Sequence, residues 1–387
     1  MASRPSPSPP LRLGPRPLPL HWQLWLSSLL SSASGLMLLP NNLMGNPKPE
    51  LQKLVAQLNQ QPASQLGPAL AQASASKINL FLQGVERYRT HPYQRRLKEP
   101  PAIWQAGSTR LMDYGGRGQP VLVLPSLINR PTVLDLTERQ SLLRWLTTQG
   151  LHVYLLDWGT PDANEGTLSI EDYLIRAGKA LAQIDTPVQL VGYCMGGLLA
   201  LALAARHPDR VAQLALLATP WDFHAPNKIA ALRAAQLYRL WQPLLGDLPV
   251  DLIQTLFTLL DPLGPAQKFV RFAEMTDKDE MDSFVALEDW LNDGVPLTRA
   301  MADTCLIDWY ERNAPQELVD PSSIRTPTLV MIPQQDRIVP PESAEALAAR
   351  LPDCRRLRVP LGHIGMIVSH SAPEQSWKPL AKWLGAH

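Results

Sequence analysis

The stretch VQLVGYCMGGLLALALAARH, residues 188–207, decides the fold. A short apolar run, residues 188–191, leads into GYCMG at 192–196, and an apolar helical pattern follows. This is a glycine–x–nucleophile–x–glycine sequence placed between a strand and a helix, the setting in which the motif forms a sharp turn. Side chains two residues before or after the nucleophile would collide with the strand or helix, so glycine is needed there. The stretch therefore predicts a strand–turn–helix unit with Cys194 at its apex.

The alternative for this stretch is a buried structural cysteine in a glycine-rich turn that binds a nucleotide. GYCMGG contains neither G-x-G-x-x-G nor a Walker lysine, which disfavours nucleotide binding. At the start of a helix, Cys194 would lie where the helix dipole stabilises a thiolate. The backbone N–H of Met195 would then point towards an oxyanion that forms on a substrate carbonyl.

Short apolar runs alternate with amphipathic helical stretches on both sides of this unit. The runs cover residues 121–124, 153–156, 188–191, 214–218, 328–332 and 356–359. The helical stretches cover residues 135–148, 169–183, 195–206, 341–350 and 373–384. This alternation predicts an α/β fold with a mostly parallel sheet and helices on both faces. Residues 222–313 contain no good strand, which predicts a helical cap, about 222–315, over the sheet edge where α/β folds bind ligands.

Composition excludes several functional classes. The 387 residues include 36 lysines and arginines against 35 aspartates and glutamates, and this balance argues against a nucleic-acid partner. The three cysteines lie far apart without a CxxC pair, so we expect neither a disulfide framework nor a metal site. A working thiol survives best in a reducing compartment, so we expect a cytoplasmic protein.

The N-terminal third differs from the rest of the chain. Many of the 38 prolines lie in residues 5–19, and we expect residues 1–49 to form a proline-rich disordered arm. Within it, residues 20–39 are too polar for a confident membrane span, which leaves a flexible arm, an interfacial amphipathic helix or a secretory signal. Residues 50–107 are expected to form a helical extension, and residues 108–387 the α/β core with its cap.

The nucleophile needs a histidine base, and His363 is the best candidate. It lies in the glycine-flanked sequence LGHIG directly after the last apolar run, residues 356–359. Folds with this kind of turn place their base in such a loop. The other histidines after the turn fit less well, because they end a helix, begin the cap or lie on a later helix: His207, His224 and His370.

The acid that orients the histidine is expected to be Asp336. It follows the apolar run 328–332 and precedes a proline that starts a helix, in QQDRIVP. Asp336 could instead cap that helix, and Asp222 remains a rival because it follows the preceding run. Nucleophile, acid and histidine then occur in the chain order of the α/β-hydrolase fold, which we predict for residues 108–387. A second oxyanion donor is expected from a backbone N–H near Ser126, in the loop after residues 121–124.

Six segments carry a resemblance to a known family. They are SLINRPTVLDL (126–136), VYLLDWGTPD (153–162), GYCMGG (192–197), ATPWDF (218–223), QQDRIVP (334–340) and GHIGMIVS (362–369). With them, residues 90–385 resemble the polyhydroxyalkanoate synthases, especially the class III catalytic subunit. The resemblance implies that Cys194 carries the acyl group, that His363 is its base and that Asp336 is the partner carboxylate. Met195 departs from the glutamine that class III members usually have.

The resemblance implies an acyltransferase that polymerises (R)-3-hydroxyacyl-CoA and releases coenzyme A, with no metal or cofactor. Its partners would be the growing polyester chain and a second copy or a partner synthase subunit. The N-terminal segment would be the contact to a polyester granule or membrane surface. Two other readings remain: a cysteine hydrolase (esterase, thioesterase or intracellular polyester depolymerase) and a non-catalytic granule scaffold. The hydrolase would use the same three residues but would admit water.

Overall fold

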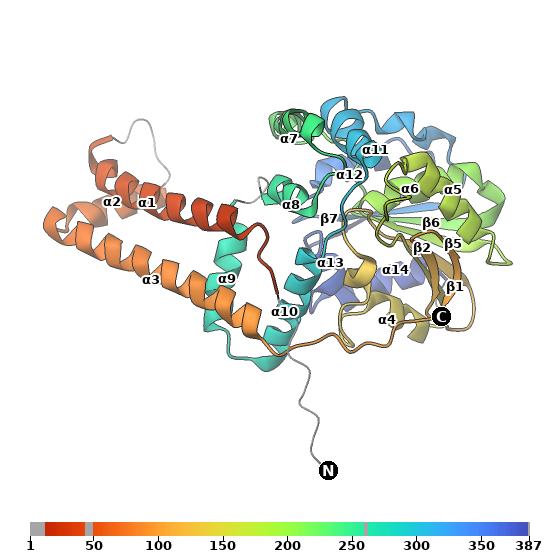
Figure 1. The fold of residues 1–387 in the computed structure, drawn as a ribbon, viewed down its shortest axis with the longest axis horizontal. Helices are drawn as coiled ribbons and strands as arrows, with labels where there is room; N and C mark the ends of the chain where they lie inside the picture. The colour runs from red at the N-terminus through yellow and green to blue at the C-terminus, as the bar shows by residue number, and fades with distance from the viewer. Residues whose placement is uncertain (1–11, 43–48, 259–261, 386–387) are drawn as a thin grey trace, which may run out of the picture. The chain divides into compact units, whose positions relative to one another are not determined.

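The computed structural model describes residues 12–42, 49–258 and 262–385, which form two compact units (Figure 1). The first unit takes the chain up to Gln94 together with Asp261–Asn292, and the second takes Arg95–Leu260 and Asp293–His387. This division differs from the expected one in two ways. The α/β unit begins at Arg95 instead of residue 108, and part of the expected cap belongs to the N-terminal unit.

The second unit contains one eight-stranded sheet in the order β1-β2-β4-β3-β5-β6-β7-β8. The strands are β1 (Ala102–Ala106), β2 (Thr109–Asp113), β3 (Pro120–Leu124), β4 (His152–Asp157), β5 (Val188–Tyr193), β6 (Val211–Leu217), β7 (Thr328–Pro333) and β8 (Cys354–Val359). Neighbours from β4 to β8 are parallel, whereas β1 and β2 form an antiparallel edge. All six predicted runs are strands of the parallel part, which confirms the predicted α/β class.

The strand β1 was not expected, because residues 50–107 were assigned to a helical extension, and β2 lies within the expected α/β core at a place where no apolar run was predicted. The last N-terminal helix ends at Thr90, and residues 102–106 instead form the outer strand of the sheet. An edge strand has one unpaired side, and β1 is partly or fully exposed along its whole length. It therefore lacks the continuous apolar run that marked the inner strands.

Helices cover both faces of the sheet. Figure 1 shows α5 and α6 on one side of the sheet and α4 and α14 on the other. The flanking helices are α4 (Leu142–Thr148), α5 (Ile170–Leu181), α6 (Met195–Arg206), α12 (Pro341–Ala348), α13 (Gly365–Val368) and α14 (Lys378–Trp383). Between β6 and β7 lie α7 (Lys228–Trp241), α8 (Val250–Thr258), α11 (Arg299–Asp303) and a π-helix, Thr304–Glu311. These last four are the part of the expected cap that belongs to this unit.

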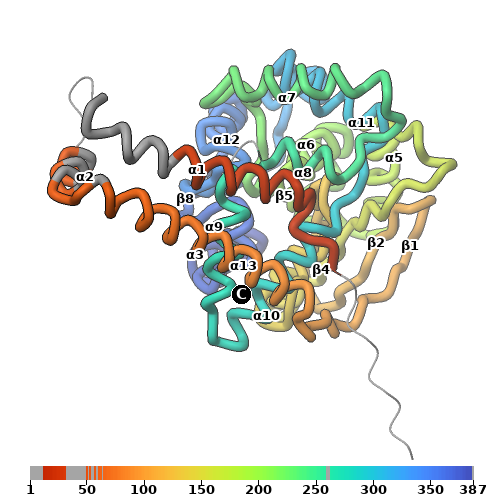
Figure 2. The backbone as a smooth tube through the Cα atoms, turned by 60° about the vertical axis from the view of Figure 1, so that its left-hand side comes forward, coloured from red at the N-terminus to blue at the C-terminus, as the bar shows by residue number. Residues whose placement is uncertain are grey.

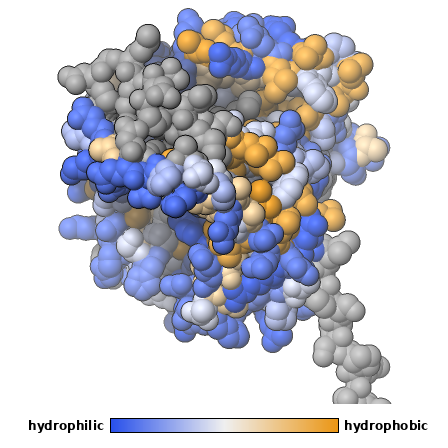
Figure 3. Space-filling view, turned by 90° about the vertical axis from the view of Figure 1, so that its left-hand side faces the viewer, coloured by the Kyte–Doolittle hydropathy of each residue, from blue (hydrophilic) through white to orange (hydrophobic). Residues whose placement is uncertain are grey.

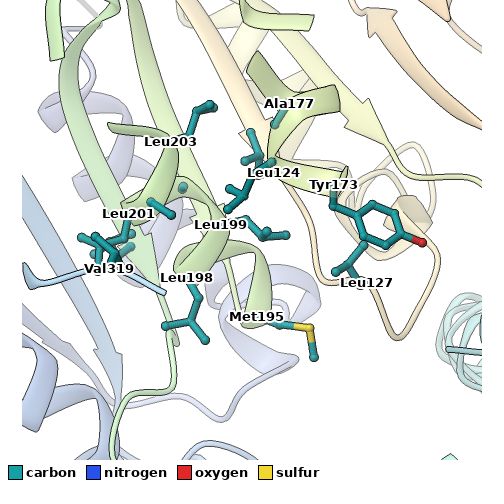
Figure 4. Packing of buried hydrophobic residues seen from close by; sticks show 14 of the residues in the cluster. Leu124, Leu127, Tyr173, Ala177, Met195, Leu198, Leu199, Leu201, Leu203 and Val319 are labelled. Carbon is teal, nitrogen blue, oxygen red and sulfur yellow. The ribbon is translucent and has the colours of Figure 1, made fainter. Parts of the chain in front are cut away.

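Helix α6 forms the centre of the core. Every residue from Met195 to Ala204 is buried, as is every residue of β5. Figure 4 shows Leu198, Leu199, Leu201 and Leu203 packed among side chains of neighbouring elements. A helix that is apolar on all sides has to be enclosed by protein, so the composition of this helix places the turn before it deep in the fold.

The first unit is a separate helical assembly. Its helices are α1 (Leu18–Asn42), α2 (Pro49–Asn59), α3 (Ala63–Thr90), α9 (Gly264–Glu274) and α10 (Lys278–Asn292). Figure 2 shows α1 and α3 running side by side. An aromatic cluster forms its core, with Phe269 in edge contact with Phe81, Tyr88 and Phe284 at centroid distances of 5.5 to 6.3 Å.

The arm expected over residues 1–49 is ordered where the structure describes it. The Arg12 guanidinium is buried, and its Nε binds the Asp289 carboxylate at 2.7 Å. Helix α1 begins at Leu18, and Pro19 occupies the first turn, where its missing N–H is tolerated. Trp25 of α1 is buried in the aromatic cluster, which explains why this segment is ordered. Residues 1–11 and 43–48 of the expected arm lie outside the described residues.

Residues 20–39 were judged too polar for a confident membrane span. Among the helices within residues 12–42, 49–258 and 262–385, none combines the length and the apolar character that a membrane-spanning helix requires.

Candidate active site

Cys194 lies at the apex of the tight turn between β5 and α6. Its backbone has φ 56° and ψ −129°, in the left-handed half of φ space that non-glycine residues rarely adopt. A hydrogen bond to the neighbouring strand fixes the turn, because the Cys194 N–H donates to the Leu217 carbonyl of β6 at 2.8 Å. A strained residue persists only where its surroundings determine it, and such residues concentrate at functional sites. The predicted strand–turn–helix unit is therefore present, with Cys194 at its apex.

The glycines around Cys194 allow the chain to make this turn. A Cβ on Gly192 would lie 2.5 Å from the Gly197 Cα, and one on Gly196 would lie 2.2 Å from the Leu124 carbonyl oxygen. A Cβ on Gly197 would lie 1.9 Å from the Thr219 Oγ1. Strand, turn and helix thus approach one another more closely than any side chain permits.

Replacing Gly197 with alanine is expected to destabilise the protein by about 2–4 kcal/mol, because the new methyl group overpacks a buried contact. Urea unfolding measures this loss. The matched control is Gly166→Ala, where a Cβ would have no atom within 4 Å, and we expect it to change stability by less than about 1 kcal/mol. Equal midpoints for the two variants would contradict this account of the turn.

The structure brings His363 and Asp336 together. The His363 Nδ1 lies 2.7 Å from the Asp336 Oδ2, and both side chains are buried. The other carboxylate oxygen, Oδ1, accepts the backbone N–H groups of Ile338 and Val339 at 2.8 Å each, which orients the carboxylate. Asp336 therefore both shapes its own loop and holds the imidazole.

The side chain of Cys194 lies near enough to the imidazole of His363 to affect its protonation. Since Nδ1 is engaged by Asp336, Nε2 is the ring nitrogen left to exchange a proton with the sulfur. Burial by itself lowers the pKa of His363, but the negative charge of Cys194 and the hydrogen bond and charge of Asp336 outweigh it and raise the pKa to about 10. The ring is thus held protonated between sulfur and carboxylate.

The rival acid lies elsewhere. The Asp222 Oδ1 accepts the His224 backbone N–H at 3.0 Å and the Asn313 side-chain amide at 2.9 Å. The contact with Asn313 joins the chain shortly after β6 to the residues that follow the π-helix, so Asp222 has a structural task. The structure brings Asp336, and not Asp222, to His363.

The two expected oxyanion donors lie on either side of the turn. Met195 begins α6, where the first N–H groups of a helix have no carbonyl partner within the helix. The Pro125 carbonyl carbon would lie 2.7 Å from a Cβ on Gly196, so the peptide that joins Pro125 to Ser126 contacts the start of α6. The N–H of Ile128 is already used, because it donates to the Ser126 Oγ at 3.3 Å. Met195 and Ser126 remain the predicted donors.

A cavity of ≈ 390 Å³ opens beside Cys194. Most of its lining is apolar, and α7, α8 and the π-helix contribute residues such as Ala230, Phe257 and Trp309. The opposite side of α7 is also apolar, since Ile229 and Leu240 are exposed by 62% and 71%. Figure 3, in which α7 lies near the top as in Figures 1 and 2, shows apolar side chains gathered there.

The residues that the π-helix contributes to this cavity were not predicted from the sequence: Cys305, Leu306, Trp309 and Tyr310. Residues five apart share a face in a π-helix but not in an α-helix, so the ordinary helical period separated Cys305 from Tyr310. Burial raises the pKa of the Cys305 thiol, as do the nearby Asp308 and Cys194 charges. Cys305 is therefore kept as a neutral thiol, although it lines the same cavity as Cys194.

Comparison with known proteins gives the same fold. The family profile of the alpha/beta hydrolase fold matches residues 119–369. Among solved structures, the chain is similar to MGS-MChE2, an alpha/beta hydrolase enzyme from the metagenome of lagoon sediments, with 17% identity and a TM-score of 0.44. That match covers 73% of this chain and 97% of the other. The profile match and the strand order together confirm the predicted fold.

Proteins that are similar to this chain in sequence indicate a narrower family than the fold does. The chain is 30% identical over 289 residues to the poly(3-hydroxyalkanoate) polymerase subunit PhaC of Allochromatium vinosum, covering 68% of this chain and 80% of that protein. It is 31% identical over 291 residues to the protein of the same name from Synechocystis sp., covering 68% and 77%. The protein of the same name from Haloarcula marismortui is 29% identical over 300 residues, covering 72% of this chain and 63% of the relative.

Proposed function

Because this chain belongs to the poly(3-hydroxyalkanoate) polymerase family of the α/β-hydrolase superfamily, we propose that it polymerises (R)-3-hydroxyacyl-CoA into polyester. The proposal includes a covalent intermediate on Cys194 and the release of coenzyme A. One observation supports it above all: a cysteine, in place of a serine, stands at the strained turn, its charge raises the pKa of His363, and His363 is bonded to Asp336.

In the first step, the Cys194 thiolate attacks the thioester carbonyl of the substrate. The carbonyl oxygen becomes an oxyanion, which the backbone N–H groups of Met195 and Ser126 stabilise. The bond between carbon and the sulfur of coenzyme A then breaks, and the imidazolium of His363 donates its proton to the leaving thiolate. One thioester replaces another, so the acyl group stays activated.

In the second step, the hydroxyl of another acyl chain attacks the thioester on Cys194. The neutral His363 accepts the hydroxyl proton, the carbon–sulfur bond breaks, and Cys194 leaves as a thiolate paired with imidazolium. Asp336 holds the ring through both steps. The net result is one new oxygen ester and one released coenzyme A, with the resting pair restored.

The apolar cavity favours this reaction over hydrolysis. An apolar lining suits an acyl chain and disfavours water, which would otherwise compete for the acyl-enzyme. The cysteine hydrolase would use the same side chains, so the two functions differ in which hydroxyl group reaches Cys194.

The test supplies 3-hydroxybutyryl-CoA to the full-length protein and follows thiol release together with turbidity and solvent-extractable polyester. We expect thiol release to rise in step with polyester. Thiol release that yields only free 3-hydroxybutyrate would establish the hydrolase instead. An absence of thiol release with substrates of every chain length would favour the scaffold.

The proposal also covers the location of the protein and the partners with which it associates. A nucleophilic thiol is best preserved under reducing conditions, which supports a cytoplasmic location. Association with a second copy or a partner subunit, and contact of the N-terminal segment with a polyester granule, stay predictions. Size measurement in solution and sedimentation with isolated granules test them.

A further inference from the structure

The π-helix Thr304–Glu311 places a tyrosine in the cavity beside the nucleophile. Tyr310 lines the cavity together with Cys194 and Cys305. π-helical turns are rare, and they occur frequently at functional sites. Here the five-residue spacing puts the buried thiol of Cys305 and the ring of Tyr310 on the same wall.

The ring of Tyr310 is held by its neighbours. It packs against Phe223 with a centroid distance of 5.3 Å, and the Tyr310 carbonyl lies 3.1 Å from the His224 ring Nε2. The Asn313 side chain, three residues on, accepts the Phe223 backbone N–H at 2.9 Å. The segment that carries Phe223 and the end of the π-helix are thus tied together, so the ring position is determined without help from the hydroxyl.

The hydroxyl of Tyr310 has no hydrogen-bond partner within the described residues, although most neutral polar groups around it are occupied. The Asn227 side chain accepts the Ala230 N–H at 3.1 Å, and the Ser343 Oγ accepts the Trp221 N–H at 3.0 Å. Burial raises the pKa of Tyr310, and the nearby Cys194 and Cys305 raise it further. The group therefore stays a neutral phenol with one hydrogen bond to donate.

We propose that the Tyr310 hydroxyl binds the 3-hydroxyl group of the acyl chain on Cys194 and so selects 3-hydroxyacyl thioesters over plain acyl thioesters. This inference rests on the proposed function. The thioester carbonyl is common to both substrate classes and is served by backbone donors, whereas the 3-hydroxyl is the group that distinguishes them. A site with a polar group directed at a substrate hydroxyl rejects the analogue without it, because the polar group is then left unpaired.

The test compares 3-hydroxybutyryl-CoA with butyryl-CoA in single-turnover acylation, followed by release of the coenzyme A thiol and by the mass of the acylated protein. The wild type should acylate faster with 3-hydroxybutyryl-CoA. Tyr310→Phe keeps the ring and its packing on Phe223, and should reduce this preference by roughly tenfold or more. The loss should arise from slower reaction with the hydroxylated substrate.

The matched control is Tyr173→Phe, which removes the hydroxyl of a buried tyrosine of α5 that lies outside the cavity. It should leave the preference unchanged, and thermal unfolding should show both variants folded. An unchanged preference in Tyr310→Phe would overturn the inference, as would an equal loss in Tyr173→Phe. A wild type that forms the acyl-enzyme but yields only free 3-hydroxybutyrate would reject the polymerase and leave the selectivity of Tyr310 measurable.

Discussion

Replacing Cys194 with alanine is expected to reduce coenzyme A release from 3-hydroxybutyryl-CoA to background, a loss on the order of 10⁶-fold. The thiolate forms the covalent intermediate, and Cys305 cannot take its place: it lines the same cavity, but burial raises its pKa and keeps it a neutral thiol. The fold should survive, because the substitution removes a single sulfur atom. Thiol release measures the loss of activity, and thermal unfolding measures whether the fold survives.

The control for this variant is Cys354→Ala. Cys354 begins β8, and its sulfur makes a long contact of 3.7 Å to the Arg355 carbonyl. This variant should keep full activity and should be acylated at Cys194 when the protein is analysed by mass. Substantial turnover by Cys194→Ala, or an acyl group found on another residue, would remove Cys194 from the mechanism.

Replacing Asp336 with asparagine is expected to lower kcat/KM by roughly 10³- to 10⁴-fold. Asparagine keeps an oxygen that can accept the Ile338 and Val339 N–H groups, so the loop should persist. It loses the negative charge opposite the imidazole and can present an N–H to the His363 Nδ1, which disfavours the proton on that nitrogen. The protein should therefore remain folded and still bind substrate, but transfer the acyl group slowly.

Asp336→Asn is also expected to change how activity depends on pH. The reactive pair needs a protonated His363, so activity should persist as pH rises until it passes the His363 pKa, which is about 10. Asp336 contributes both a hydrogen bond and a charge that raise this pKa. Removing the charge should move the basic limb of the kcat/KM profile to lower pH. A loss of activity without any movement of the limb would indicate a structural role only.

Asp157→Asn provides the control for Asp336→Asn. Asp157 is the last residue of the parallel strand β4, and its carboxylate is bonded to Arg110 at 2.7 Å. Its replacement should leave both kcat/KM and the basic limb within about twofold of wild type. If Asp157→Asn matched Asp336→Asn in both readings, the choice of Asp336 as the acid would be wrong.

The inner strands and the nucleophile turn could be predicted because their signals are local. A run of apolar residues that is buried on both faces identifies an inner parallel strand wherever it falls, and glycine at 192, 196 and 197 is required by the turn itself. The edge strand β1 carried no such signal, since it is mostly exposed. The division of the expected cap between two units could not be predicted either, because helical periodicity does not indicate which hydrophobic core a helix packs against.

The amino-acid sequence by itself determined the α/β class, the turn at Cys194 and the order of nucleophile, acid and base, because each depends on neighbouring residues and their periodicity. Only the tertiary structure decided that Asp336 meets His363 while Asp222 joins Asn313, since both aspartates follow strands and look alike in sequence. The structure alone also brought Tyr310 beside Cys194, through a π-helical turn and a cavity built from segments more than a hundred residues apart. Such contacts arise from the packing of whole elements, which no local pattern records.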